Sequence, residues 1–137
     1  MADRLHSAAL HLLRRLRTED DALGVSPPRL SALSVVVFAG PIGIGALAAA
    51  EGVTAPTMSR LVDGLERDGY VTRAPDPADA RGVLVRATAA GTRTLRKGRR
   101  QRVEALADGL GRLSADELRA VARGAELIER VTREATS

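Results

Sequence analysis

Hydrophobic residues recur at helical spacing along most of the chain. This spacing predicts six helices, at 3–17, 28–39, 42–51, 55–67, 89–113 and from 115 onward, with Thr88 as the cap of the fifth. Between the fourth and fifth helices, the stretches 71–73 and 83–87 alternate as strands do, and they flank a polar, proline-rich loop at 75–82. The pattern therefore predicts a mainly α fold that carries one small β-hairpin.

The stretch 53–67 has the clearest helix boundaries. Thr54 occupies an N-cap position and Pro56 is tolerated only in a first turn, so the helix should begin at Ala55. Its buried face is predicted to hold four apolar residues, Met58, Leu61, Val62 and Leu65. The opposite face is polar and carries Pro56, Arg60, Asp63 and Arg67, flanked by Thr57 and Ser59. Small and hydroxylic residues followed by an arginine fit a nucleic-acid groove, although an ordinary solvated face is the alternative.

The preceding helix stands in a specific relation to this stretch. Ala48 is followed by Gly52 four positions later, and then by Met58 and Leu61 at +10 and +13. A small residue lets two helices cross closely, a glycine makes the turn, and apolar residues seal the second helix onto the first. The spacing is typical of a helix-turn-helix, in which 55–67 would be the recognition helix.

Charge is placed unevenly along the 137 residues. The overall net charge is +4, but residues 1–53 are neutral, 54–102 carry +6 and 103–137 carry −2. The excess is dense in the first half of the fifth predicted helix, where phosphate is the expected partner. A basic stretch beside a candidate recognition helix indicates a partner such as double-stranded DNA, while a solvated charged face is the alternative.

Several classes of protein are disfavoured by composition. The chain has no cysteine, and His6 and His11 lie five positions apart, roughly 140° around a helix, so they do not share a metal-binding face. No set of nucleophile, base and orienting group and no phosphate loop is present, so we expect no enzyme activity, no cofactor and no metal. No run of about twenty apolar residues could span a bilayer, and the charged N-terminal segment is unlike a signal peptide, so we expect a cytoplasmic location and no membrane partner.

The first and last predicted helices are amphipathic and have no obvious place to bury their apolar stripes within one subunit. A homodimer interface built from the first, fifth and sixth helices would bury them. In the monomeric alternative, these helices pack only on one another. We therefore expect helical dimerisation regions at 1–27 and 89–137 around a DNA-binding lobe at 28–88.

The order of helices, recognition helix, hairpin and long helix resembles the MarR family of winged helix-turn-helix transcription regulators over almost the whole chain. The residues that carry the resemblance are MSRLVDGLE (58–66), DGYVTR (68–73), DPADAR (76–81) and ATAAG (87–91). The resemblance implies a two-fold dimer on a pseudo-palindromic operator, with each recognition helix in a major groove and each wing at the flanking minor groove. A repressor is the expected activity.

The resemblance also assigns candidate DNA-binding residues. Thr57, Ser59 and Arg60 match groove-contacting positions, and Arg81 matches the wing-tip arginine; from the residues alone, the Asp79 carboxylate can hold Arg81 extended, or the two can form an incidental surface pair. The predicted site also includes Thr54 and Arg73.

Many members of the MarR family release DNA when a small lipophilic ligand or aromatic carboxylate binds, so the resemblance implies a possible effector. Here Phe38 is the one expected aromatic pocket residue, and the absence of cysteine excludes the peroxide-sensing branch. Two other functions stay open: a weakly specific architectural DNA-binding protein, and a winged-helix module that binds an acidic protein.

Overall fold

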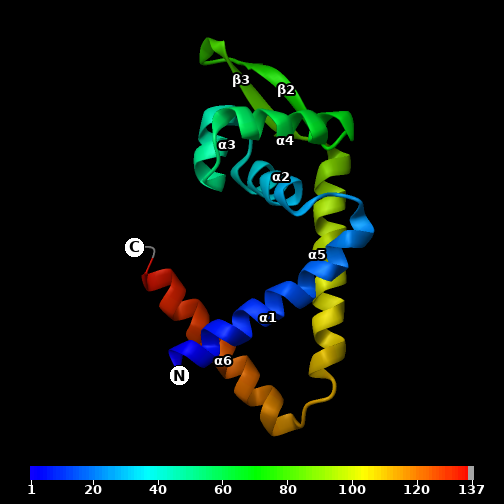
Figure 1. Ribbon diagram of the computed structural model, residues 1–137, viewed down its shortest axis with the longest axis vertical. Coiled ribbons are helices and arrows are strands. Elements are labelled where there is room, and N and C mark those ends of the chain that lie inside the picture. Colours follow the sequence, from blue (N-terminus) through cyan, green and yellow to red (C-terminus); the bar gives the residue numbers. More distant parts are fainter. Residues whose placement is uncertain (136–137) are drawn as a thin grey trace. The chain divides into compact units, whose positions relative to one another are not determined.

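The computed structural model describes residues 1–135, which form helices and one three-stranded antiparallel sheet (Figure 1). The elements in chain order are α1 (Ala2–Asp20), the 3-10 helix η1 (Asp21–Leu23), α2 (Pro27–Ala39), β1 (Ile42–Gly43), α3 (Ile44–Glu51), α4 (Ala55–Arg67), β2 (Val71–Asp76), β3 (Asp79–Ala87), α5 (Ala89–Leu110) and α6 (Ala115–Glu134). The mainly α fold with a β-hairpin wing is therefore confirmed. Two compact units are present, 1–102 and 103–137; the functional division into a lobe at 28–88 and dimerisation helices stays a prediction.

Local signals define both ends of α4. The Thr54 hydroxyl oxygen accepts a hydrogen bond from the Thr57 amide at 3.3 Å, as an N-cap should, and Pro56 lies in the first turn. At the other end, Gly69 adopts a left-handed φ of 80°, which a glycine reaches without strain. The Gly69 amide donates to the Glu66 carbonyl and the Tyr70 amide donates to the Leu65 carbonyl, which together form a Schellman C-cap. The predicted bounds of this helix agree with the structure.

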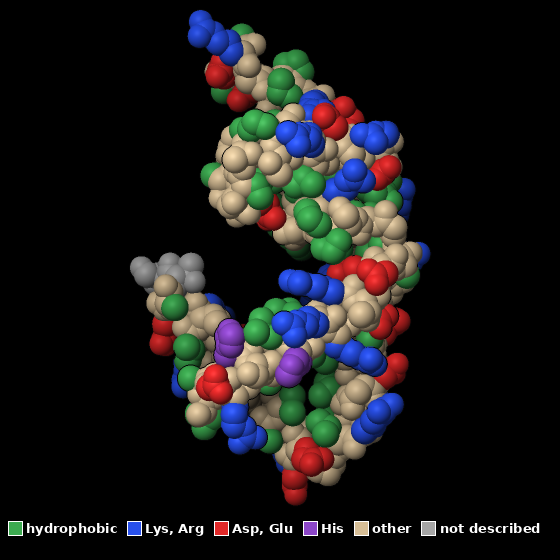
Figure 2. All heavy atoms as spheres, in the orientation of Figure 1, with side chains coloured by type: hydrophobic (Ala, Val, Ile, Leu, Met, Phe, Trp, Pro, Cys, Tyr) green, Lys and Arg blue, Asp and Glu red, His purple; other side chains and the backbone are tan. Residues whose placement is uncertain are grey.

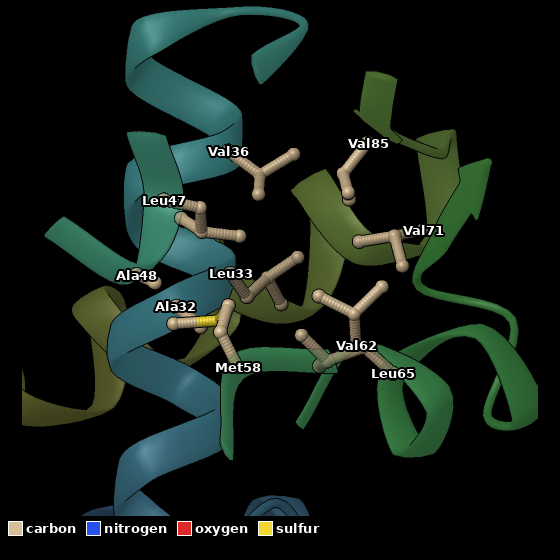
Figure 3. Close-up of a cluster of buried hydrophobic side chains, with 10 residues drawn as sticks. All are labelled: Ala32, Leu33, Val36, Leu47, Ala48, Met58, Val62, Leu65, Val71 and Val85. Carbon is tan, nitrogen blue, oxygen red and sulfur yellow. The ribbon is translucent and has the colours of Figure 1, made fainter. Parts of the chain in front are cut away.

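One apolar core holds α2, α3, α4 and the sheet together (Figure 3). Its ten buried residues are Ala32, Leu33, Val36, Leu47, Ala48, Met58, Val62, Leu65, Val71 and Val85. A smaller cluster of Val25, Leu30 and Leu95 joins the start of α2 to α5, and Tyr70 packs against both clusters. The polar face of α4 is thus presented by a helix whose other face is buried at Met58, Val62 and Leu65 and half-buried at Leu61.

The wing is longer than the sequence pattern predicted. Most of the expected loop 75–82 belongs to strands, because Pro75 pairs with Val83 and Asp76 pairs with Asp79. A proline is acceptable at this position because β2 is an edge strand, where a missing N–H costs no ladder bond on the open side. Only the two residues between the strands form the turn, and the Ala78 amide donates to the Asp76 carboxylate across it at 2.8 Å.

Other boundaries differ for identifiable reasons. The third helix begins at Ile44 instead of Ile42, because Ile42 and Gly43 form β1 and pair with β3; Gly43 is the N-cap residue. The long helix begins after Thr88 as predicted but ends at Leu110, where Gly111 begins the turn that leads to α6. The first helix extends to Asp20 rather than stopping at Arg17.

The two terminal helices, each within its own compact unit, have no fully buried residue. In α6, the Ser114 hydroxyl accepts from the Glu117 amide and the Glu117 carboxylate accepts from the Ser114 amide, so the two residues form a capping box. Within residues 1–135 no single helix is long and apolar enough to cross a membrane; the bent pair Ala2–Leu23 and Pro27–Ala39 reaches the required length and composition only when taken together.

Candidate nucleic-acid interface

The first turn of α4 presents polar groups over a buried anchor. Thr54, Thr57 and Arg60 are exposed and Ser59 is half-buried, whereas Met58 between them is completely buried. The Thr54 hydroxyl donates to the Thr57 hydroxyl at 2.9 Å, which leaves the hydrogen of Thr57 available to donate outward. The structure therefore brings these four predicted site residues together on the N-cap and first two turns of a firmly packed helix; the segment 54–60 is called the reading turn below.

The turn before α4 has the geometry of a helix-turn-helix. Gly52 adopts a left-handed φ of 66°, and its amide donates to the Ala49 carbonyl at 3.2 Å. The Val53 amide then donates to the Ala48 carbonyl at 3.0 Å, which closes the end of α3. Ala48 is buried in the same core as Met58, so α3 packs against the buried side of the reading turn.

The wing tip differs in detail from the expected ion pair. The Asp79 carboxylate accepts a hydrogen bond from the Arg81 amide at 3.0 Å, and in residues 1–135 no ion pair joins the two side chains. Asp79 thus fixes the backbone at the base of Arg81 and leaves the guanidinium exposed. Figure 2 shows basic side chains at the outer end of the wing and around α4.

Arg73 differs from these exposed groups, because its side chain is only 25% exposed and is held by α4. Its guanidinium pairs with Asp63 at 2.7 Å and with Glu66 at 3.2 Å, and it also donates to the Ser59 carbonyl at 3.3 Å. The Arg73 amide donates to the same Glu66 carboxylate at 3.2 Å. The sequence pattern gave no sign of Asp63 and Glu66 as partners, since the pairing requires the packing of β2 against α4.

The end of α4 is joined to the start of α5 by a compact hydrogen-bonded joint. The Thr88 amide donates to the Tyr70 carbonyl at 3.0 Å, and the Thr88 hydroxyl donates to the Gly69 carbonyl at 2.6 Å. The same hydroxyl oxygen accepts from the Gly91 amide at 3.0 Å and so caps α5, as predicted. One threonine side chain therefore connects the C-cap of α4 with the N-terminus of α5.

Two pockets lie within the unit 1–102. The first, of about 210 Å³, is lined by Ser34, Val37, Phe38, Leu95, Arg96, Arg99 and Arg102. The second, of about 450 Å³, adjoins it at Leu95 and Arg102 and extends to Arg17 and Asp20, where Arg102 forms an ion pair with Asp20. Phe38 does line a pocket, but its side chain is 78% exposed. Across the described part of the chain, no group of three or more His, Cys, Asp or Glu residues is arranged to hold a metal ion.

Comparisons with known proteins agree with this geometry. A MarR family model matches residues 23–82, which run from the last residue of η1 into β3. An HTH-type transcriptional regulator from Mycobacterium tuberculosis is 37% identical over 128 residues, which cover 93% of this chain and 90% of the relative.

Solved structures are similar over nearly the whole chain. A transcriptional regulator from Thermotoga maritima superimposes with a TM-score of 0.84 at 25% identity, covering 98% of this chain and 94% of that one. A MarR family protein from Bacillus stearothermophilus gives a TM-score of 0.82 at 26% identity, with 99% and 93% covered. With this similarity and with the helix-turn-helix and wing described above, the chain belongs to the MarR family of DNA-binding transcription regulators.

Proposed function

We propose that the protein is a homodimeric repressor that binds a pseudo-palindromic operator and is released by a small lipophilic ligand. The observation that carries the proposal is the reading turn of α4, where exposed Thr54, Thr57 and Arg60 surround the fully buried Met58. A helix that enters a major groove by its N-terminal end offers these residues to base edges and phosphates. Ser59 completes this surface.

The wing supplies the second contact in this proposal. Arg81 is exposed and its backbone is fixed by Asp79, so its guanidinium can reach the minor groove, whose negative potential attracts arginine. Arg73 is already engaged by carboxylates, so we assign it a supporting role rather than a contact with bases.

Exposed apolar residues on the terminal helices support the dimer. In α1, Leu5, Leu12 and Leu13 are 48%, 44% and 52% exposed. Separately, the exposed large apolar residues of α6 are Leu118, Val121, Ile128 and Val131. Apolar stripes of this kind are covered when two copies associate about a two-fold axis. Such a dimer binds two half-sites related by the same symmetry, which requires a pseudo-palindromic operator.

The pocket beside Phe38 supports an effector. Val37, Phe38 and Leu95 supply apolar surface, and Arg96 and Arg99 supply positive charge at its edge. This combination fits a small lipophilic carboxylate, which would release DNA by binding more tightly to a dimer whose two recognition helices are not spaced for the operator. We further propose a cytoplasmic location, where the chromosome lies, and no catalytic activity.

The test is a footprint on the DNA upstream of the protein's own coding region, with wild type and three variants. Arg60→Ala should weaken operator binding more than binding to a scrambled duplex, because a base contact adds about 1–3 kcal/mol of discrimination. Arg81→Ala should reduce affinity and the dependence on flanking A·T content. Arg112→Ala removes one exposed cation outside the winged helix-turn-helix and serves as the charge-matched control.

The rival functions give different results. A protected region without discrete boundaries would indicate an architectural protein and contradict the proposal. Failure of ordinary duplex DNA to compete with an acidic protein partner would indicate a protein-interaction module. Equal losses on operator and scrambled DNA for Arg60→Ala would restrict this residue to phosphate contact, and unchanged binding by Arg81→Ala would remove the wing tip from the interface.

A further inference from the structure

The recognition helix carries two carboxylates that would oppose DNA if they were left free. Asp63 and Glu66 lie on α4 after the reading turn, and their side chains are 53% and 43% exposed. Both lie within two turns of Arg60, on an element that must approach a densely charged phosphate backbone. Like charges brought together in this way reduce affinity.

Arg73 neutralises both groups from β2. One guanidinium nitrogen, Nη2, lies 2.7 Å from Asp63 Oδ1, and the other, Nη1, lies 3.2 Å from Glu66 Oε1. The backbone amide of Arg73 adds a hydrogen bond to Glu66 Oε2, so this carboxylate is held through both of its oxygens. Charge-assisted contacts with such fixed geometry are among the stronger hydrogen bonds in proteins.

The same pattern extends to the C-cap of the helix. Asp68 pairs with Arg29 of α2 at 3.8 Å. By contrast, neither arginine of α4, Arg60 or Arg67, has an ion-pair partner within residues 1–135. The acidic groups of the recognition helix are therefore compensated by other elements, while its basic groups are left available.

Arg73 also touches the reading turn directly. Its Nη2 donates to the carbonyl oxygen of Ser59, the residue before Arg60. The contact joins the base of the wing to the backbone of the first two turns of α4. A change at Arg73 would thus affect both the charge beside the turn and its orientation.

We propose that Arg73 is a positioning residue for DNA recognition: it neutralises Asp63 and Glu66 and holds the Ser59 backbone, without contacting DNA itself. The proposal rests on DNA binding by the family to which the chain belongs. It gives Arg73 a role distinct from that of an arginine that neutralises a phosphate. The two roles make opposite predictions when the acidic partners are removed together with the arginine.

The experiment compares wild type with Arg73→Gln, with the triple variant Arg73→Gln, Asp63→Asn, Glu66→Gln, and with Arg112→Ala as the charge control. Dissociation constants are measured over a range of salt concentrations on the duplex upstream of the coding region and on a scrambled duplex of equal length. Thermal unfolding of each variant establishes that it is folded.

Arg73→Gln should weaken binding to both duplexes by roughly 10- to 100-fold, because two carboxylates then face phosphates uncompensated. The triple variant should recover to within about threefold of wild type, with the same dependence of log Kd on log salt, because no phosphate contact has been lost. A merely structural role would lower the unfolding temperature without this recovery.

The opposite result would overturn the proposal. If Arg73 neutralises a phosphate, the triple variant stays as weak as Arg73→Gln and its salt slope becomes shallower by about 0.9. Wild-type affinity in Arg73→Gln would also overturn it. The scrambled duplex makes this test independent of the operator. Absence of a discrete footprint would contradict the proposed repressor function, but the affinities of the variants for the scrambled duplex could still be compared.

Discussion

Gly91, in the first turn of α5, cannot accept a side chain without moving the joint to α4. An ideal Cβ at this position would lie 3.0 Å from the Tyr70 carbonyl carbon, closer still to its oxygen, and 3.2 Å from Leu33 Cδ1. Carbon contacts favour about 3.5–4.0 Å, so the Tyr70 carbonyl would have to retreat by roughly 1 Å. That carbonyl accepts the Thr88 amide, and retreat would break the bond.

The expected size of the effect follows from these contacts. Overpacking costs about 2 kcal/mol and the lost hydrogen bond about 1 kcal/mol, while replacing a helical glycine by alanine returns about 1 kcal/mol. Gly91→Ala should therefore destabilise the fold by about 2 kcal/mol. In a chain of this length that corresponds to a fall in Tm of roughly 8 °C.

The assay is thermal unfolding followed by circular dichroism, with Gly109→Ala as the matched control. Gly109 lies in the same helix, is exposed, and has no atom within 4 Å of a built Cβ. Its replacement by alanine should raise stability by about 0.5–1 kcal/mol. If Gly91→Ala were as stable as wild type or more stable, as is expected of Gly109→Ala, the contact between Tyr70 and α5 would accommodate a Cβ without loss of stability. That result would refute the reasoning.

Four further outcomes are expected. Leu65→Ala empties a fully buried position and should lower the free energy of unfolding by about 2–5 kcal/mol, seen as a lower urea midpoint at unchanged m; a loss below 1 kcal/mol would contradict its burial. Ser114→Ala removes the α6 capping box and should cost about 1 kcal/mol in the same assay, whereas no change would mean that the cap is dispensable. Phe38→Ser, at a 78% exposed site, should change stability by less than about 0.5 kcal/mol; a larger loss would place Phe38 in the core. Val121→Glu should convert the proposed dimer to monomer in light scattering after gel filtration, and an unchanged mass would remove this face of α6 from the interface.

Local chemistry explains which elements could be predicted from the sequence. The bounds of α4 were predictable because Thr54, Pro56 and Gly69 act within one turn of the helix ends they define. The capping box at Ser114 was predictable for the same reason. The exposure of Thr54, Thr57 and Arg60 followed from their position on a helix whose other face is apolar.

Features that depend on distant partners could not be predicted in this way. β1 exists only because Ile42 and Gly43 pair with β3, about forty residues later, and the outer wing strands exist only because they pair with each other. The pairing of Arg73 with Asp63 and Glu66 likewise depends on β2 packing beside α4. No periodicity within a short window contains this information.

The inner and outer halves of the wing differ in how many strands hold them. Near its base, Leu84 and Val85 of β3 have a strand on each side, β1 and β2, so this half is continuous with the core. From Val83 toward the turn, β3 pairs only with β2, and the pairing becomes irregular between Pro75 and Asp76. In the proposed complex with DNA, the outer half can therefore bend to follow grooves of different width while α4 stays still. Residues inserted at the tip would lengthen the arm without redirecting the helix, so in that complex the reach of the wing along the duplex would change independently of the bases that α4 contacts.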